Sequence, residues 1–416
     1  MAPSVDRREF LELTSLASAG ATLGLGAASR AEAGGAPAVR AQPGSPDVIV
    51  VGAGAFGAWT ALALRERGAT VTLIDAYGPA NSRATSGDET RQIRLGYGDR
   101  ALYSKWAQKA MEKWKARQAE FGRTLLLPTG RLQLAPDWTP GLRATQQIVS
   151  SLGAAIEPLG VDDLRKRFPQ IDPQGVGVGL FEPGAGILRA REALLAATDA
   201  FVKKGGVFTI ARATPGTPAS GGLGGLSVGS GTMTASTYVF ACGPWLKALF
   251  PTVVGPRLST PRREVFFVGV PAGDTRFLHP NMPNYSEDSH YGFPSVDGRG
   301  VKVCPVGTEL PQVNPDRDSR IVSAEMVADV YAYLARRFPA LKDQPIVETR
   351  VCQLENTKDE HFFIDRHPDW RNVWIAGGGS GHGFKHGPNM GEFIADSVLG
   401  RPVDPEYAAL FKWRPA

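Results

Sequence analysis

Residues 47–75 read DVIVVGAGAFGAWTALALRERGATVTLID, and this stretch decides the fold. It opens with an apolar run, 48–51, of the kind that a strand buried on both faces shows. A complete G-x-G-x-x-G follows over 52–57, then a helical pattern to Gly68, then a second apolar run that ends in Asp75. This order of strand, glycine-rich turn, helix, strand and terminal acid predicts a βαβ unit that binds a dinucleotide.

The glycines of this motif are expected to have separate roles. Gly52 allows the tight turn out of the strand, Gly54 lets a diphosphate approach backbone N–H groups, and Gly57 lets the helix pack closely on the strand. The N-terminus of the helix then faces the diphosphate with its partial positive charge. Asp75 is placed to accept a hydrogen bond from a ribose hydroxyl. The cofactor-binding residues predicted for this unit are Gly52, Gly54, Ala55, Phe56, Gly57 and Asp75.

Composition describes a globular chain that is large enough for two lobes. Of the 416 residues, 43% are apolar and 21% are charged. The net charge of +5 is small for this length, and the chain has no Lys/Arg block and no basic stripe interleaved with aromatic residues, so nucleic-acid binding is not expected. After the N-terminal segment no apolar run approaches the roughly 20 residues of a membrane span, so a stable span is not expected either.

The N-terminal segment is typical of a twin-arginine signal peptide. Arg7-Arg8 precede a mildly apolar run over 13–28, and Ala31-Glu32-Ala33 has the small residues of a cleavage site. The alternative is an ordinary first helix with a chance arginine pair. The prediction is a signal peptide over 1–33, a tether over 34–46, and export to the periplasm or the extracellular space through the twin-arginine translocation machinery. That route carries folded proteins, which suits a chain that acquires a cofactor in the cytoplasm.

The rest of the chain alternates helical and strand-like patterns. Residues 81–89 are small and polar and indicate a loop, and Arg91 and Arg94 follow three positions apart, a spacing that shares one face of a helix. The residues from 215 to 231 are rich in glycine and predict hairpin connections. Further helices are expected over 103–121, 163–168, 191–205, 321–338 and about 389–399, and strands over 130–134, 207–211, 237–241 and 373–376.

Two later segments are also expected to face the cofactor. The strand 237–241 runs into a turn that carries Gly243 and Trp245, and the strand 373–376 feeds a glycine-dense turn at the start of the last long helix. The cofactor-binding residues that these patterns predict outside the first unit are Val207, Gly243, Trp245, Gly381, His382, Gly383, Phe384 and Lys385. Because these segments lie at both ends of the chain, the middle is expected to be inserted between them.

An ordered set of motifs carries a resemblance to a known family. The motifs are DVIVVGAGAFG, GDETRQIRLGYG, YGFPS, the KV pair that begins at Lys302, CQLENTKDEHF and SGHGFK. Over residues 47–400 the chain resembles the monomeric sarcosine oxidase and N-methyltryptophan oxidase family of flavoproteins, within the D-amino-acid oxidase superfamily. The resemblance implies FAD and a monomer. It also implies an α/β fold in which a Rossmann-like FAD-binding domain of the glutathione-reductase type is interleaved with an α+β substrate domain on a large antiparallel or mixed sheet.

The same resemblance divides the chain into segments. The FAD-binding segments are expected at about 47–98, 185–256 and 345–400. The substrate-domain segments are expected at about 99–184 and 257–344. Residues 401–416 are left as a C-terminal tail.

The resemblance assigns roles to three residues near the flavin ring. Cys352 matches the cysteine that is covalently joined to the flavin, although a small buried cysteine is the ordinary alternative. Arg91 matches an arginine packed near the ring. Lys302 matches the lysine that activates dioxygen, where a cation stabilises the charge formed on oxygen; the alternative is an outward-facing strand lysine. Cys242 and Cys304 are expected to be structural, and a disulfide stays open for an exported protein.

The resemblance also implies a substrate pocket. Arg94 and Lys385 match two cations that hold a substrate carboxylate. Tyr291 matches a tyrosine that lines the pocket, and His382 either lines it or shapes its turn; both are included with Lys302 and Arg91 as candidate catalytic residues. Metal ligands are not predicted.

Two departures from the family bear on the substrate. The family carries a histidine where this chain has Val306 and a tyrosine where it has Leu354. The pocket is therefore more apolar, which puts sarcosine itself in doubt and favours a bulkier amine.

The predicted function is an exported FAD-dependent oxidase of a secondary amine or of an N-methyl or cyclic amino acid. Hydride passes from the α C–H to flavin N5, the imine is hydrolysed, and O₂ is reduced to H₂O₂. The competing function is that of a flavin dehydrogenase of an amino acid or hydroxy acid, which passes electrons to a carrier. Cys352 and the second glycine-rich phosphate loop weigh against an NAD-dependent reductase. Arg94, Lys385 and Lys302 together weigh against a flavin-bearing protein without turnover.

Overall fold

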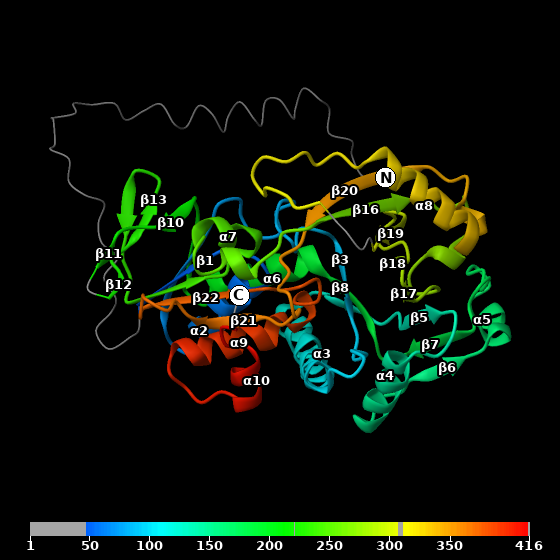
Figure 1. Ribbon diagram of the computed structural model, residues 1–416, viewed down its shortest axis with the longest axis horizontal. Helices are drawn as coiled ribbons and strands as arrows, with labels where there is room; N and C mark the ends of the chain where they lie inside the picture. Colours follow the sequence, from blue (N-terminus) through cyan, green and yellow to red (C-terminus); the bar gives the residue numbers. More distant parts are fainter. Residues whose placement is uncertain (1–46, 220, 307–310, 415–416) are drawn as a thin grey trace, which may run out of the picture. The chain divides into compact units, whose positions relative to one another are not determined.

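The glycine motif lies at the centre of a six-stranded sheet. In this computed structural model, which describes residues 47–219, 221–306 and 311–414, the strand order is β21-β22-β15-β1-β2-β9. Figure 1 labels β1, β21 and β22 of this sheet. All neighbours are parallel except the edge pair β21–β22. The strands are β1 (Asp47–Val51), β2 (Thr70–Asp75), β9 (Val207–Ile210), β15 (Thr237–Phe240), β21 (Phe363–Arg366) and β22 (Val373–Gly377). The predicted signal peptide and tether lie outside the described residues.

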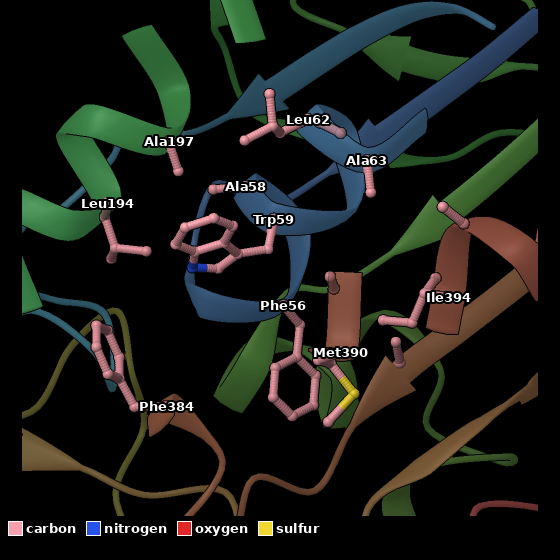
Figure 2. Close-up of a cluster of buried hydrophobic side chains, with 14 of the residues drawn as sticks. Phe56, Ala58, Trp59, Leu62, Ala63, Leu194, Ala197, Phe384, Met390 and Ile394 are labelled. Carbon is pink, nitrogen blue, oxygen red and sulfur yellow. The ribbon is translucent and has the colours of Figure 1, made fainter. Parts of the chain in front are cut away.

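Helix α2 of the glycine motif (Ala55–Glu66) is almost entirely buried. It packs between the sheet and the helices α6 (Ala190–Lys203) and α9 (Gly387–Val398). Figure 2 shows Trp59 of α2 among the side chains of these helices. A Cβ on Gly391 of α9 would lie 2.4 Å from the backbone of Trp59, so only glycine lets the two helices approach this closely.

The same core takes in two elements that were expected elsewhere. Helix α3 (Ala101–Phe121) contributes Trp106 and Trp114, although residues 99–184 were expected in the substrate domain. The supposed C-terminal tail contains helix α10 (Pro405–Leu410), and Tyr407 and Phe411 are buried in this core. Tyr407 and Phe411 are too large and too apolar for a solvated tail. Both rings stack on Trp106 of α3.

The opposite face of the six-stranded sheet is covered by small β elements, which include hairpins in the glycine-rich region where hairpin connections were predicted. The short strands β10 to β14 form a three-stranded and a two-stranded sheet, and helix α7 follows. Their bounds are β10 (Ala213–Pro215), β11 (Pro218–Ala219), β12 (Gly222–Leu223), β13 (Leu226–Val228), β14 (Gly231–Met233) and α7 (Leu246–Leu249). The first sheet is thus covered on both faces, as a mainly parallel sheet requires.

An eight-stranded mixed sheet forms the second half of the fold, in the order β20-β16-β19-β18-β17-β5-β7-β6. Its strands are β5 (Arg131–Ala135), β6 (Glu157–Leu159), β7 (Val178–Glu182), β16 (Arg262–Val268), β17 (Asn284–Ser286), β18 (His290–Phe293), β19 (Val301–Pro305) and β20 (Ile346–Gln353). The accompanying helices are α4 (Pro140–Ser151), α5 (Val161–Arg167) and α8 (Ala324–Arg337). The expected mixed or antiparallel substrate sheet is confirmed.

Helix α8 covers one face of this second sheet and decides which side chains face the other way. Val301 and Val303 pack in the core that includes α8. Since side chains alternate along a strand, Lys302 and Cys304 project from the opposite face. The same alternation puts Leu132 of β5 in the α8 core and sends Arg131 to the opposite face.

Residues 90–94 do not form the helix that the arginine spacing suggested. Thr90–Ile93 form strand β3, which pairs antiparallel with β8 (Gly186–Arg189), and β8 also pairs with β4 (Leu126–Leu127). The expectation rested on local spacing alone, whereas β8 supplies long-range pairing that a local pattern does not contain. Short 3₁₀ turns complete the fold: η1 (Gly243–Trp245), η2 (Gly255–Arg257), η3 (Thr275–Phe277), η4 (Pro339–Leu341) and η5 (Phe384–His386). Among the described helices, none has the length and apolar character to cross a membrane.

Candidate active site

A cavity of about 590 Å³ is lined by residues from both large sheets. It runs along the carboxyl end of β1 and the free face of the eight-stranded sheet. Of the predicted site residues, the following line it: Gly52, Gly54, Ala55, Phe56, Asp75, Arg91, Arg94, Gly243, Trp245, Tyr291, Lys302, Cys352, Gly381, His382, Gly383, Phe384 and Lys385. Segments that are far apart in the sequence therefore meet in one place, as the interleaved organisation predicts.

The turn between β1 and α2 has the geometry of a diphosphate cradle. Gly52 has φ +103°, and a Cβ there would lie 2.4 Å from the Ala241 carbonyl oxygen. A Cβ on Gly57 would lie 1.8 Å from the Gly52 carbonyl oxygen, so this glycine packs the helix and does not line the cavity. The N-terminus of α2 has no side-chain cap and no acid in its first turn. Its first N–H groups are therefore available to an anion.

Asp75 lies at the same end of the cavity. Its carboxylate accepts the N–H of Ala53 at 2.7 Å and the N–H of Tyr77 at 2.8 Å. Burial raises the pKa of Asp75, and these hydrogen bonds oppose the rise. Each carboxylate oxygen has a second lone pair, so the group can still accept a ribose hydroxyl from the cavity.

Val207 was expected to bind the cofactor and does not line the cavity. It lies on the edge strand β9 with 57% of its surface exposed. The cavity is lined instead by Ala211, Arg212 and Ala213, just beyond the end of that strand. Parallel strands present ligands at their carboxyl ends, and Val207 is the first residue of its strand.

Glu355 lies in the wall of the cavity and was not predicted. Its Oε1 atom accepts the N–H of Gly379 at 3.3 Å, while Oε2 is buried and has no hydrogen-bond partner among the described residues. A Cβ on Gly243 would lie 3.7 Å from Oε2. Burial raises the pKa of Glu355 to about 7, so a protonated carboxyl can donate a hydrogen bond into the cavity near neutral pH.

Cys352 lines the cavity from β20, next to Arg263 of β16. The side chain is buried and the thiol is free, as are the thiols of Cys242 and Cys304. Burial raises the pKa of the Cys352 thiol, and the nearby Arg91 acts in the opposite direction.

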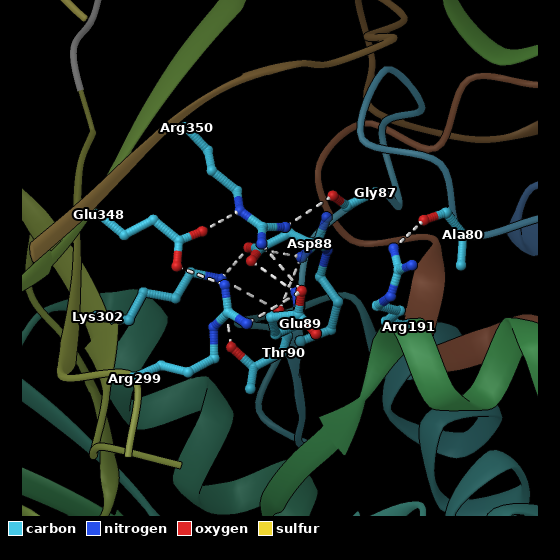
Figure 3. A network of polar contacts seen from close by, with 11 residues as sticks. Ala80, Gly87, Asp88, Glu89, Thr90, Arg191, Arg299, Lys302, Glu348 and Arg350 are labelled. Carbon is cyan, nitrogen blue, oxygen red and sulfur yellow. Dashed lines mark hydrogen bonds and ion pairs between the residues drawn. The ribbon is translucent and has the colours of Figure 1, made fainter. Parts of the chain in front are cut away.

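Lys302 and Arg91 share one buried carboxylate, that of Asp88. The Lys302 ammonium pairs directly with Asp88, and Arg91 lies 3.0 Å from the same oxygen atom. Figure 3 shows Lys302 and Asp88 within a wider polar network that includes Glu89 and Arg350. Burial raises the pKa of Asp88, but Lys302 and Arg91 outweigh this effect and lower it to about 2. The Lys302 side chain thus pairs with an ionised carboxylate at the cavity wall.

Lys385 and Arg94 lie at the other end of the cavity, together with Tyr97. The Lys385 ammonium donates to the Tyr97 hydroxyl at 3.0 Å and to the His382 carbonyl at 3.0 Å. The Arg94 guanidinium lies 4.4 Å from the centre of the Tyr97 ring, and its NH1 atom is buried without a partner in the described part of the chain. Burial, then Arg94 and Arg131, lower the pKa of Lys385 well below its usual value. An anion bound here would relieve this destabilisation.

His382 contributes structure to this end of the cavity. Its Nε2 atom lies 2.9 Å from the Glu360 carbonyl oxygen and Nδ1 lies 3.4 Å from the Tyr97 hydroxyl. Burial, followed by the Lys385 ammonium, lowers the pKa of His382 to about 3. The ring is therefore neutral at pH 7.

Tyr291, Val306 and Leu354 also line the cavity. Burial raises the pKa of Tyr291 well above its usual value, so its hydroxyl stays protonated. The two apolar residues lie where the resemblance placed a histidine and a tyrosine, and both face the same space.

The lining residues that were not predicted include the charged side chains of Asp88, Arg131 and Glu355. Arg131 carried a readable signal, because it begins an alternating strand, R-L-Q-L, whose leucines fit a core. Asp88 lies within GDETRQIRLGYG and Glu355 within CQLENTKDEHF, but no neighbouring residue in the sequence indicates that either side chain is buried.

The cavity fits FAD. The glycine turn, the uncapped helix end and Asp75 are suited to the adenosine diphosphate half, and the orphaned Glu355 carboxyl faces the space beyond them. Among the described residues no cluster of His, Cys, Asp and Glu could hold a metal ion.

Comparison with known proteins agrees with this geometry. Monomeric sarcosine oxidase from Bacillus sp. (strain B-0618) is 28% identical over 386 residues, which cover 89% of this chain and 96% of the relative. N-methyl-L-tryptophan oxidase from Yersinia pestis (strain Pestoides F) is 26% identical over 86% of this chain and 95% of the relative. The crystal structure of fructosamine oxidase (Amadoriase II) from Aspergillus fumigatus has a TM-score of 0.77 and 25% identity and covers 89% of each chain.

The model of one protein family matches nearly all of the described chain. The match runs over residues 47–397, from the first strand to the last long helix. The chain belongs to the DAO family of FAD-dependent oxidoreductases.

Proposed function

We propose that this protein is an FAD-dependent oxidase of secondary amines, acting on N-methyl or cyclic amino acids. The observation that carries the proposal is the pair Arg94 and Lys385. Both face the cavity, and neither forms an ion pair with a carboxylate in the part of the chain that the structure describes. A buried cation without a counter-ion is costly, so these groups are suited to an anionic ligand.

The residues of the cavity would orient the substrate. The Arg94 guanidinium and the Lys385 ammonium bind its carboxylate, which holds the α C–H bond in a fixed place. Bound FAD supplies the acceptor for the two electrons of that bond and passes them to O₂. The products are H₂O₂ and an imine, which water hydrolyses to a carbonyl compound and an amine.

Lys302 is proposed as the residue that assists O₂. It is a buried cation fixed by Asp88, and a preorganised cation stabilises negative charge that develops on oxygen. This feature favours an oxidase over an amino-acid or hydroxy-acid dehydrogenase that passes electrons to a carrier.

Cys352 is proposed as the covalent link to FAD. Its thiol is free, it lines the cavity, and Arg91 lies near enough to lower its pKa against the effect of burial. The bond would join Sγ to the flavin 8α carbon. Two electrons and two protons leave in total, and O₂ is the final acceptor.

The test is anaerobic bleaching of the purified yellow protein. A panel of N-methyl and cyclic amino acids should include at least one compound that bleaches the flavin, and admission of air should restore the colour with formation of H₂O₂. Bleaching without recovery in air would favour the dehydrogenase. No bleaching by any amine would contradict the amine-oxidase proposal.

Export is proposed separately and depends on residues 1–33. Replacing Arg7 and Arg8 by lysine should trap a folded yellow precursor in the cytoplasm. Unchanged export of this double variant would contradict the twin-arginine proposal.

A further inference from the structure

Arg131 brings a third cation to the substrate end of the cavity. It lies at the start of β5, lines the cavity and is only 7% exposed. A Cβ on Gly96, two residues after Arg94, would lie 3.7 Å from Arg131 NH1, and the Arg131 charge lowers the pKa of Lys385 after the larger effects of burial and of Arg94. Three elements that are distant in sequence thus direct positive charge at one volume.

The hydrogen bonds of Arg131 leave much of its guanidinium unused. The NH1 atom donates to the Gln133 amide oxygen at 3.0 Å and NH2 donates to the Ser286 hydroxyl at 2.7 Å. Both acceptors are neutral. The Nε atom is buried and has no partner among the described residues. A guanidinium has five N–H donors, so these two neutral bonds leave further donors free for a ligand.

The acids around this end of the cavity are already engaged. Glu182 lies opposite Arg131 in the β5–β7 pair, and its oxygens accept the backbone N–H groups of Leu95 at 2.5 Å and Gly96 at 3.2 Å. Glu287 lines the cavity but pairs with Arg337 at 3.0 Å. Burial, followed by Arg94, lowers the pKa of Arg131 to about 9, which shows how strongly the surroundings disfavour its charge.

The charges do not balance with one substrate carboxylate. With Lys385 protonated, Arg94, Arg131 and Lys385 carry three positive charges, and the carboxylate of Glu182 offsets one of them. A single substrate carboxylate leaves one cation uncompensated in a buried site. A second carboxylate on the substrate would remove the deficit and would find N–H donors on Arg131 that are free to bind it.

We propose that Arg131 binds a second carboxylate and that the substrates are secondary amino dicarboxylic acids. This inference rests on the proposed amine-oxidase function, since it names the substrate class of the same site. Arg131 is accordingly a specificity-determining residue. Val306 and Leu354 would contact the apolar part of such a substrate.

The decisive measurement needs no turnover. Calorimetry of the yellow holoenzyme compares succinate with butyrate, which have the same chain length but two and one carboxylates. Wild-type protein should bind succinate at least about tenfold more tightly, since a charge-assisted contact in a buried site is worth more than about 1.4 kcal/mol. Equal affinity for the two acids, or no detectable binding of succinate, overturns the proposal.

Two variants then assign the preference to Arg131. Arg131→Gln should bring the affinity ratio of the two acids close to one, and Arg131→Lys should retain part of it. Arg165→Gln, an exposed arginine of the same half of the fold, is the control and should keep the wild-type ratio. If Arg131→Gln keeps the wild-type ratio of succinate affinity to butyrate affinity, the assignment to Arg131 is overturned. If Arg131→Gln does not fold, Arg131→Lys decides instead. An affinity ratio in Arg131→Lys that is no lower than in wild type overturns the assignment to Arg131.

A second readout uses reactive ligands. N-methylaspartate should reduce the flavin anaerobically at lower concentration than N-methylasparagine, its neutral isostere. Reduction by both at equal concentration leaves the oxidase proposal standing and overturns the role of Arg131. If neither compound reduces the flavin, the oxidase proposal loses support, while the succinate experiment still decides whether Arg131 binds a second carboxylate.

Discussion

The Lys302 ammonium and the Asp88 carboxylate form a buried ion pair, although the two residues are 214 positions apart in the chain. Lys302 comes from β19 of the second sheet, and Asp88 comes from the loop before β3. The pair therefore joins the two halves of the fold beside Cys352. It also fixes where the cation lies, because the Lys302 ammonium is within 3.3 Å of both oxygen atoms of Thr90.

Lys302→Met should slow re-oxidation of the flavin far more than its reduction. Removal of one preorganised electrostatic group costs about 10²–10³ in rate. Stopped-flow measurement of the two half-reactions checks this expectation. Lys247→Met, at an exposed lysine, is the control. Equal slowing of both half-reactions would indicate that Lys302 belongs to the scaffold.

Asp88→Asn should destabilise the protein, because it leaves the buried Lys302 ammonium and the partly buried Arg91 without their carboxylate partner. Breaking a buried pair by removing one partner costs about 3–5 kcal/mol. The free energy of unfolding from urea titration at pH 7 measures the loss. Asp162→Asn, at a carboxylate that is fully exposed on α5, should change it by less than about 0.5 kcal/mol.

The ion pair between Lys302 and Asp88 also predicts how the stability of the protein depends on pH. The pKa of Asp88 is lowered from 3.8 to about 2, so the folded chain holds the ionised form more tightly than the unfolded chain does. The associated stability, about 2 kcal/mol, is present above pH 4 and is lost as the pH falls through 2. Asp88→Asn should lack this component of acid unfolding. An unchanged acid profile in the variant would contradict the assignment.

Local motifs predicted the parts of the site that depend on local geometry. Gly52 and Gly57 could be assigned because a tight turn and a close helix contact need glycine at fixed spacing. The alternation of Val301, Lys302 and Val303 did not tell which face of the sheet Lys302 occupies. The structure decides this, because α8 covers the two valines. Asp88 was unpredictable for the same reason, since its partner comes from another sheet.

Predictions from local residue patterns were wrong where pairing between distant segments decides the structure. The arginines at 91 and 94 fit a helix by spacing, but β8 makes 90–93 a strand. Val207 has the apolar character of a buried strand, but its position on the edge of the sheet leaves it exposed. Both features depend on neighbours that no local pattern contains.

The carboxylate clamp yields a prediction about substrate binding. Lys385→Met or Arg94→Met should weaken binding of amino-acid substrates by about 2–5 kcal/mol, because each variant removes one partner of a charge-assisted contact in a buried site. Flavin content should stay near one per chain. The half-saturation for anaerobic flavin reduction measures the effect. If both variants keep the wild-type KM and kcat, the substrate carboxylate is not bound here.

Glu355 yields a prediction about stability and pH in flavin-free protein. Its pKa is raised from 4.5 to about 7 by burial, so the folded chain holds the protonated form more tightly. No stability is lost below pH 4.5, and about 3 kcal/mol is lost as the pH rises through 7. Glu355→Gln keeps the shape without the charge and should flatten this loss. The free energy of unfolding of flavin-free Cys352→Ser protein, measured at pH 5 and pH 8, tests this expectation. Glu112→Gln, at an exposed residue of α3, is the control.

The last prediction concerns the covalent link. If Cys352 is joined to FAD, acid-precipitated wild-type protein should stay yellow and the flavin should migrate with the polypeptide in a denaturing gel. Cys352→Ser should release the flavin into the supernatant, whereas Cys242→Ser and Cys304→Ser should not. Burial raises the pKa of the Cys352 thiol, so only a small fraction is thiolate at neutral pH. Attachment of FAD to flavin-free protein should therefore become faster between pH 6 and pH 9. Free release of FAD from acid-treated wild type would show that the cofactor is held without a covalent bond.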